Sequence, residues 1–244
     1  MRRFALLIVA VVCAACKPAP PKPAKPSTVP MTRATVVTIR TTIQPGNRTL
    51  THTLVIQGDR ARSTAEHETW RFFDVKAKTV TFVDDVERTI RTEPLTSIVK
   101  RRRAATSARL PAHYASVRFT RGNERRMLQG VAAQQSIIQS GAYRRELWLA
   151  EHPSIPRGLF AMMHAAETPS SPLAPMMRAV DDALSTVQGF PLLDHSVVPY
   201  GNKKMVIERA VVSIAQQNVP AASIAIPAGY RDLTKPAASP RPSS

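Results

Sequence analysis

Residues 34–56 read ATVVTIRTTIQPGNRTLTHTLVI, and this stretch decides the fold. The residues before Pro45 alternate between apolar and polar side chains, and so do those after Asn47. Alternation with a period of two is typical of a half-buried strand, and Pro45-Gly46-Asn47 favours a turn between two such strands. The stretch therefore predicts a long antiparallel hairpin.

Outward from this hairpin, short alternating runs recur about every ten residues, with Gly, Asn and Asp between them. Such spacing predicts a meandering sheet, with turns at Gly58-Asp59, Arg121-Gly122-Asn123 and Ser140-Gly141. The predicted strands are Ala61–Glu68, Thr69–Val75, Thr79–Val83, Glu87–Arg91, His113–Thr120, Arg125–Val131, Gln134–Gln139, Tyr143–Ala150, Leu192–Val198, Lys203–Ile214 and Ala221–Ile226.

Three segments have helical spacing instead. One begins at Pro94 and ends in the basic run Lys100–Arg103, whose cations interact favourably with a helix C-terminus. The others are Pro156–Glu167 and Pro172–Val187, with Ser154 and Ser171 as candidate N-caps. We expect an α+β, mainly β domain: a single large curved antiparallel sheet, a half-open β-barrel, with about three helices against its concave face.

In element order, residues 32–233 resemble the lipoprotein-carrier-like group of bacterial envelope proteins, to which LolA, LolB and LppX belong. The local cues are Trp70–Asp74, Glu146–Trp148, Gly189–Pro191 and Ile226–Tyr230. The resemblance implies a half-barrel closed by helices and the carriage of a lipid or lipoprotein. It places no carrier's functional residues on this chain.

The first sixteen residues are typical of a secretory leader: Arg2 and Arg3, the apolar run Phe4–Val12, then small residues and Cys16. The apolar run is too short to cross a bilayer. Ala14-Ala15-Cys16 resembles the lipobox of bacterial lipoproteins, which implies lipid attachment at Cys16, although Cys13 stands where that family usually has an aliphatic residue. An ordinary signal-peptidase cut, releasing a soluble periplasmic protein, is the alternative.

These features predict four regions: a lipoprotein signal peptide at residues 1–16, a Pro-rich tether at 17–31, the β-rich domain at 32–233 and a tail at 234–244. Lys17–Pro30 contains six prolines and three lysines, a composition that stays extended. We expect a lipid-anchored envelope protein that faces the periplasm. Lys17 after the cysteine favours the outer membrane over the inner one, because it lacks the Asp that retains some lipoproteins at the inner membrane.

The formal net charge is +17, and eleven basic residues against one acid fall between Lys100 and Arg145. A concentration of this kind favours anionic partners, here an anionic envelope polymer or lipid headgroups rather than nucleic acid. The alternative is that the fold scatters these side chains over several faces. The predicted patch consists of Lys100, Arg101, Arg102, Arg103, Arg125 and Arg126.

The chain shows no motif of a nucleotide site or a hydrolase, and its six histidines lack metal-ligand spacing. Asp194-His195-Ser196 has the residue types of a triad, but neighbours on one strand cannot assemble it. Both cysteines lie in the leader region, so the mature domain has neither a disulfide nor a cysteine nucleophile. We expect no enzyme activity, no metal and no cofactor.

The predicted late helices carry one anomaly, a group of flexible side chains suited to variable apolar ligands. These candidate ligand-binding residues are Phe160, Met162, Met163, Met176 and Met177. The alternative is ordinary core packing. We therefore expect a hydrophobic or amphiphilic ligand between sheet and helices. The competing interpretation is an envelope interaction or sensor module with a filled core and a basic binding surface.

Overall fold

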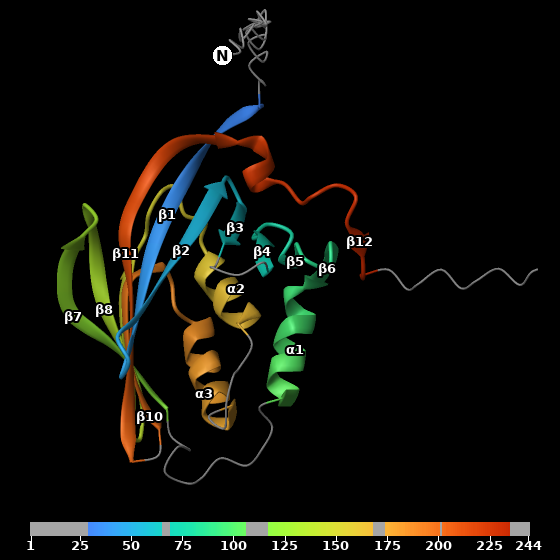
Figure 1. Ribbon diagram of the computed structural model, residues 1–244. Coiled ribbons are helices and arrows are strands. Elements are labelled where there is room, and N and C mark those ends of the chain that lie inside the picture. The colour runs from blue at the N-terminus through green and yellow to red at the C-terminus, as the bar shows by residue number, and fades with distance from the viewer. Residues whose placement is uncertain (1–28, 65–68, 106–116, 168–173, 201, 235–244) are drawn as a thin grey trace, which may run out of the picture.

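The structure is a computed structural model that describes residues 29–64, 69–105, 117–167, 174–200 and 202–234. In this part of the chain, twelve strands form one curved sheet, and three helices lie against its concave side (Figure 1). The expected α+β, mainly β class and half-open barrel are confirmed. Cys16, the leader and most of the predicted tether lie outside the described residues.

The strands are β1 (Met31–Gln44), β2 (Arg48–Gln57), β3 (Arg60–Thr64), β4 (Thr69–Asp74), β5 (Thr79–Asp84), β6 (Thr89–Pro94), β7 (Arg118–Leu128), β8 (Val131–Ser140), β9 (Tyr143–Ala150), β10 (Phe190–Tyr200), β11 (Lys203–Pro220) and β12 (Arg231–Asp232). Their order across the sheet is β12-β6-β5-β4-β3-β2-β1-β11-β10-β9-β8-β7. The predicted hairpin is confirmed, with Val37 opposite Leu54 in the β1–β2 pair. All pairs are antiparallel except β12 with β6.

The helices are α1 (Leu95–Ala105), α2 (Leu159–Ala166) and α3 (Ala174–Ser185). Figure 1 shows all three on the inside of the curve, with α2 against β4 and β10 and α3 against β8. Apolar side chains of the strands and helices meet there in one core, represented by Val37, Phe73, Leu147, Leu159 and Leu184, each no more than 1% exposed. Burial of this apolar surface is the main stabilising term of the fold.

One predicted turn and one predicted strand were wrong. Arg121-Gly122-Asn123 is not a turn between strands but an irregularity inside β7, where the pairing with β8 shifts between Arg121 and Arg125. The turn falls instead at Gln129-Gly130, where both residues have positive φ. Ala221–Ile226 is not a strand, because Ala221–Ile224 forms a 3-10 turn after β11, which is longer than predicted.

The predicted start of the second helix was also wrong. α2 begins at Leu159 rather than Pro156, and its N-cap is Gly158 with φ +87°, without a side-chain cap from Ser154. A left-handed backbone at this position suits glycine. The other candidate cap, Ser171, lies outside the described residues.

The C-terminal segment crosses the convex side of β2–β6 and ends beside β6 (Figure 1). Asp85 anchors it, accepting hydrogen bonds from Trp70 Nε1 at 3.0 Å and from the Tyr230 hydroxyl at 3.0 Å. The backbone N–H of Leu233 then donates to Ile90 O at 2.8 Å. These bonds hold Leu233 at the outer edge of the sheet, where it forms part of a pocket described below.

Candidate functional site between sheet and helices

The predicted methionine-rich site is packed where the structure describes it. Met162 is 2% exposed and Phe160 9% exposed, and both belong to the core, with Met163 packed against it. None of these three side chains lines a described pocket. Met176 and Met177 lie in α3, but their side chains are outside the description. Their role stays a prediction.

The predicted basic patch is largely neutralised by carboxylates. Arg101 pairs with Glu93 at 2.6 Å, Arg103 with Asp182 at 3.0 Å, and Arg126 with Glu124 at 3.8 Å. Arg102 was wrongly assigned to a surface patch, because it is 7% exposed and paired with Asp181. Lys100 and Arg125 are exposed. The interaction of these two with an anionic partner stays a prediction.

Arg102 instead joins the three helices. From α1 it donates to both carboxylate oxygens of Asp181 on α3, with Nη2 2.9 Å from Oδ1. Its Nη1 donates to the carbonyl oxygen of His164 at 3.1 Å, and also to that of Glu167 beyond the C-terminal end of α2. His164 Nε2 lies 2.7 Å from Asp181 Oδ1. A cation beside the last carbonyl groups of a helix stabilises that helix. Arg102, His164 and Asp181 thus form a helix latch that ties α2 to α1 and α3.

A second ionic cluster lies on the concave face of the sheet. Arg145 on β9 binds Asp194 on β10 through two hydrogen bonds of 2.9 and 2.7 Å, and both side chains are at most 5% exposed. Arg209 on β11 contacts the same carboxylate at 3.2 Å, and Ser196 donates to it at 3.2 Å. His195 points to the other face and lies 3.7 Å from Glu208. The side chains of Asp194, His195 and Ser196 therefore do not meet at one site, and they form no triad.

The two carboxylates of these clusters are held in the ionised state. Burial acts to raise the pKa of Asp194, but the charge and hydrogen bonds of Arg145 outweigh it and leave the pKa below its ordinary value. Burial likewise acts to raise the pKa of Asp181, and hydrogen bonds from His164 and Arg102 lower it. Both clusters stabilise charge within the fold rather than presenting it to solvent.

The part of the concave face formed by β3–β6 carries a pocket of about 420 Å³. Two rows of side chains that run across the strands line it, together with Trp70 and Val83, which belong to a smaller apolar cluster on the other face of the sheet. In one row Ser63 lies opposite Arg71, Arg71 opposite Phe82, and Phe82 opposite Arg91. The second row is Thr69, Asp84 and Thr89, and Leu233 closes the outer edge.

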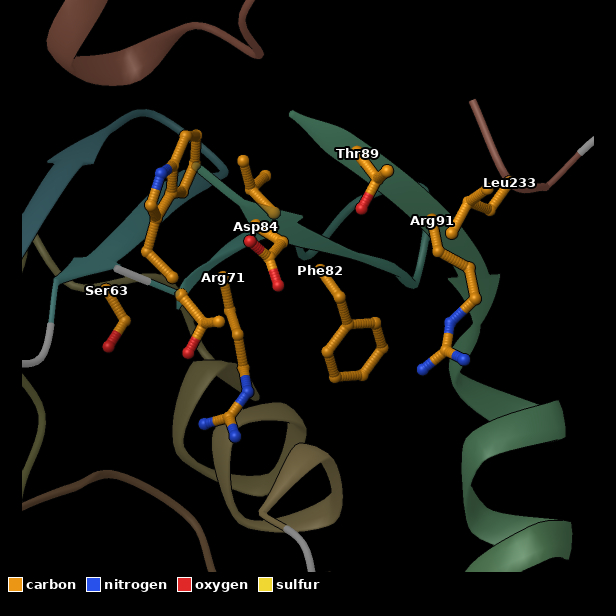
Figure 2. A pocket seen from close by; sticks show the side chains of 10 residues that line it. Ser63, Arg71, Phe82, Asp84, Thr89, Arg91 and Leu233 are labelled. Atoms are coloured by element: carbon orange, nitrogen blue, oxygen red, sulfur yellow. The ribbon is translucent and has the colours of Figure 1, made fainter. Parts of the chain in front are cut away.

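Figure 2 shows Arg71, Phe82 and Arg91 projecting from the same side of the strands. The guanidinium carbons of Arg71 and Arg91 lie 5.9 and 5.2 Å from the centre of the Phe82 ring. This is the range of cation–π contact, so the ring holds both cations at the pocket. Phe82 is half-buried and Leu233 is 50% exposed, so the pocket offers apolar surface beside charge.

The two arginines of the pocket differ in their partners. Arg91 pairs with Glu93 at 2.8 Å, and Glu93 is shared with Arg101. Among the described residues, no carboxylate forms an ion pair with Arg71. Asp84 also lines the pocket, but its Oδ1 accepts the backbone N–H groups of Val86 and Glu87 at 3.0 and 2.9 Å. The charged side chains that line this pocket are thus two cations, Arg71 and Arg91, and one carboxylate, Asp84.

The described residues contain no group of three or more His, Cys, Asp or Glu side chains placed to hold a metal ion. Within the same part of the chain, no helix has the length and apolar character needed to cross a membrane.

No protein-family model and no curated protein matches the chain. Solved structures do match in fold. PNGF-II in a C2 crystal form has a TM-score of 0.45 and 9% identity, covering 82% of this chain and 30% of that one. Its P21 form gives a TM-score of 0.37 with 10% identity, over 76% of this chain and 29% of that one.

A LolA superfamily protein from Nitrosomonas europaea matches with a TM-score of 0.30 and 7% identity, over 82% of this chain and 91% of that one. It belongs to the group that the element order resembles. This chain spans less than a third of the length of PNGF-II. Likeness at such identities and TM-scores concerns the fold alone and says nothing of ligand or activity.

Proposed function

We propose that this chain is a non-enzymatic binding protein for a hydrophobic or amphiphilic ligand, held in the pocket on the concave face of β3–β6. The observation that carries the proposal is apolar surface left uncovered there. Phe82 and Leu233 border about 420 Å³ of open space on the side of the sheet that faces the helices. Elsewhere on that face, the described side chains of the helices pack directly against the strands.

The free energy available to such a ligand comes from transfer of its apolar part out of water. Each methylene group buried against Phe82 and Leu233 contributes about 0.8 kcal/mol. A pocket of this size is within the usual range for small-molecule sites. Carriage of a lipid or acylated protein is the finer form of the proposal, which the ionic helix latch would serve by keeping the helices in place over the sheet.

Replacing Leu233 by asparagine should weaken binding of a neutral apolar dye such as Nile red about three- to tenfold. The change removes an apolar wall at a 50% exposed position, so the fold should tolerate it. Fluorescence titration of the full-length chain measures the affinity. Val86→Asn is the matched control, because Val86 is 59% exposed and does not line the pocket. Equal affinities of the two variants, or no dye binding by the wild type, would contradict the proposal.

We also propose that the chain works in the cell envelope, lipid-anchored through Cys16 and facing the periplasm. Support comes from the leader, the small residues before Cys16 and the Pro-rich segment that follows. The bacterial lipoprotein modification supplies more than one acyl chain, which stable anchoring requires.

Cys16→Ala should therefore shift the protein from the membrane fraction to the soluble periplasm, or stop processing of the leader. Fractionation followed by mass measurement of the mature N-terminus distinguishes the two results. A processed Cys16→Ala protein that stays entirely in the membrane fraction would refute the lipid anchor. It would leave the pocket proposal untouched, because that proposal rests on residues 63–91 and on Leu233.

The interaction or sensor module remains the second candidate, and one observation favours it. The centre of the helix–sheet interface is filled by packed side chains such as Met162, Leu159 and Leu184. This candidate predicts that the purified protein carries no lipid. Native mass spectrometry of the protein isolated from its own cells separates it from the ligand-binding proposal.

A further inference from the structure

We infer that the ligand of the β3–β6 pocket carries a single anionic headgroup, a carboxylate or a phosphate, which Arg71 binds while the apolar part lies on Phe82. This inference rests on the proposed function and names the chemical class of the ligand.

Arg71 is available to an anionic ligand. It is half-buried at the centre of the row Ser63–Arg71–Phe82, and no described carboxylate pairs with it. Arg91, on the other side of Phe82, is engaged by Glu93 at 2.8 Å. A guanidinium presents donors in a planar fork that matches carboxylate and phosphate oxygens, and it is more weakly hydrated than an ammonium group. Of the two arginines that line this pocket, Arg71 is therefore the better placed to bind an anion.

The surroundings of Arg71 suit an amphiphile. Ser63 lies directly opposite it in the β3–β4 pair and lines the same pocket. Side chains in directly opposed positions have Cβ atoms about 5 Å apart, so the Ser63 hydroxyl lies within reach of an anion on Arg71. Phe82 lies opposite Arg71 on the other side, with its ring 5.9 Å from the guanidinium carbon. Donor, cation and apolar ring thus follow one another along a single row.

The side chains that line the pocket carry one more positive than negative charge, because Arg71 and Arg91 face a single carboxylate, Asp84. Asp84 lines the pocket from the neighbouring row, and its Oδ1 is turned into the β5–β6 turn, where it accepts two backbone N–H groups. Glu93 is shared between Arg91 and Arg101. The excess of one positive charge around the pocket favours an anion over a neutral or cationic headgroup.

Four ligands with the same ten-carbon tail test this inference: decanoate, decyl phosphate, decanol and decyltrimethylammonium, each below its micellar concentration. Calorimetric titration of the full-length chain should give about tenfold tighter binding of the two anions than of decanol, and weaker binding of the cation. The ratio of decanoate to decyl phosphate affinity then separates a fatty-acid ligand from a phosphate-bearing one.

Arg71→Gln should bring both anions to the affinity of decanol and leave decanol unchanged. Arg60→Gln is the matched control. It removes the same charge from the opposite face of the same part of the sheet, where Arg60 is 62% exposed and 3.5 Å from Asp74. If Arg71→Gln fails to fold, the salt dependence of ligand binding by the wild-type protein tests the inference instead. Raising the ionic strength should weaken anion binding but not decanol binding.

The contrary outcomes fall into three cases. Equal affinity of the wild type for decanol and the anions overturns the anionic headgroup and leaves the proposed function standing. If Arg60→Gln loses as much anion affinity as Arg71→Gln, the loss comes from the lower net charge of the protein. That result overturns the role of Arg71. Absence of binding by all four ligands overturns both the inference and the proposed function.

Discussion

Replacing Asp194 by alanine is expected to lower the free energy of unfolding by about 3–5 kcal/mol. Asp194 is 2% exposed and binds Arg145 through two hydrogen bonds, with Arg209 at 3.2 Å. Its removal leaves the guanidinium of Arg145 buried without its carboxylate. Desolvation of an unpaired charge is much more costly than the loss of one net hydrogen bond. Urea denaturation followed by circular dichroism measures the change.

The matched control lies on the same strand pair. Glu208→Ala removes a carboxylate that faces the opposite side of the sheet, 48% exposed and 3.7 Å from His195, and it should cost less than about 1 kcal/mol. The double variant Arg145→Met, Asp194→Leu should recover most of the stability, because apolar residues of similar size replace a buried ion pair well. A loss below about 1 kcal/mol for Asp194→Ala would show that Arg145 is not buried as described.

The difference between wild type and Asp194→Ala should also depend on pH. The pKa of Asp194 is lower in the folded state than its ordinary value. Its contribution to stability is therefore fully present above the ordinary value for Asp, near pH 4, and is lost as the pH falls through that value toward the folded pKa. The two proteins should accordingly differ most at neutral pH and converge in acid.

The sheet could be predicted because its signals are local. Alternation over residues 34–56 and the Pro-Gly-Asn turn are sufficient for β1 and β2, and Tyr143–Ala150 was predicted with the same bounds as β9. The wrong turn at Arg121–Asn123 has a physical reason. Gly122 and Asn123 have turn chemistry, but the strand continues through them, with Gln134 Nε2 donating to Gly122 O at 3.1 Å. Pairing with β8 overrides the local preference there.

The ionic clusters around Asp194 and Asp181 were not predicted, although the sequence contains a feature that indicates each of them. The inward positions of β10 are Phe190, Leu192, Asp194 and Ser196, so a charged residue interrupts an apolar face. Asp181 on α3 likewise lies next to Val180 and one turn before Leu184, and both of these apolar side chains are buried. A carboxylate in such a position predicts a buried cation. Its partner, 49 residues away for Asp194 and 79 for Asp181, depends on the tertiary fold.

The pocket could not be predicted for a related reason. Its row of Ser63, Arg71 and Phe82 exists only because β3, β4 and β5 pair in one register. A shift by one residue would turn Arg71 to the other face of the sheet. Leu233 joins these residues from the far end of the chain, through the hydrogen bonds of the C-terminal segment.

Replacing Arg102 by methionine should destabilise the protein by about 3 kcal/mol and release the three helices from one another. Asp181 and the carbonyls at the end of α2 lose the same guanidinium together. Because the helices cover the concave face, hydrogen exchange should speed up in α1, α2 and α3 more than in β1 and β11. Urea denaturation measures the loss of stability, and hydrogen exchange followed by mass spectrometry measures the opening of the helices.

The neighbouring residue supplies the control. Arg103 also reaches from α1 to α3 and pairs with Asp182 at 3.0 Å, but both side chains are more than half exposed. Arg103→Met therefore removes the same kind of charge from the same two helices, but the carboxylate it leaves, Asp182, is mostly exposed, whereas Asp181 is only 19% exposed; it should cost less than about 1 kcal/mol. Similar losses in the two variants would mean that general charge, not the buried latch, holds the helices. A larger loss for Arg102→Met, with faster exchange confined to the helices, would show that the contacts of Arg102 with Asp181 and with the end of α2 hold the three helices together.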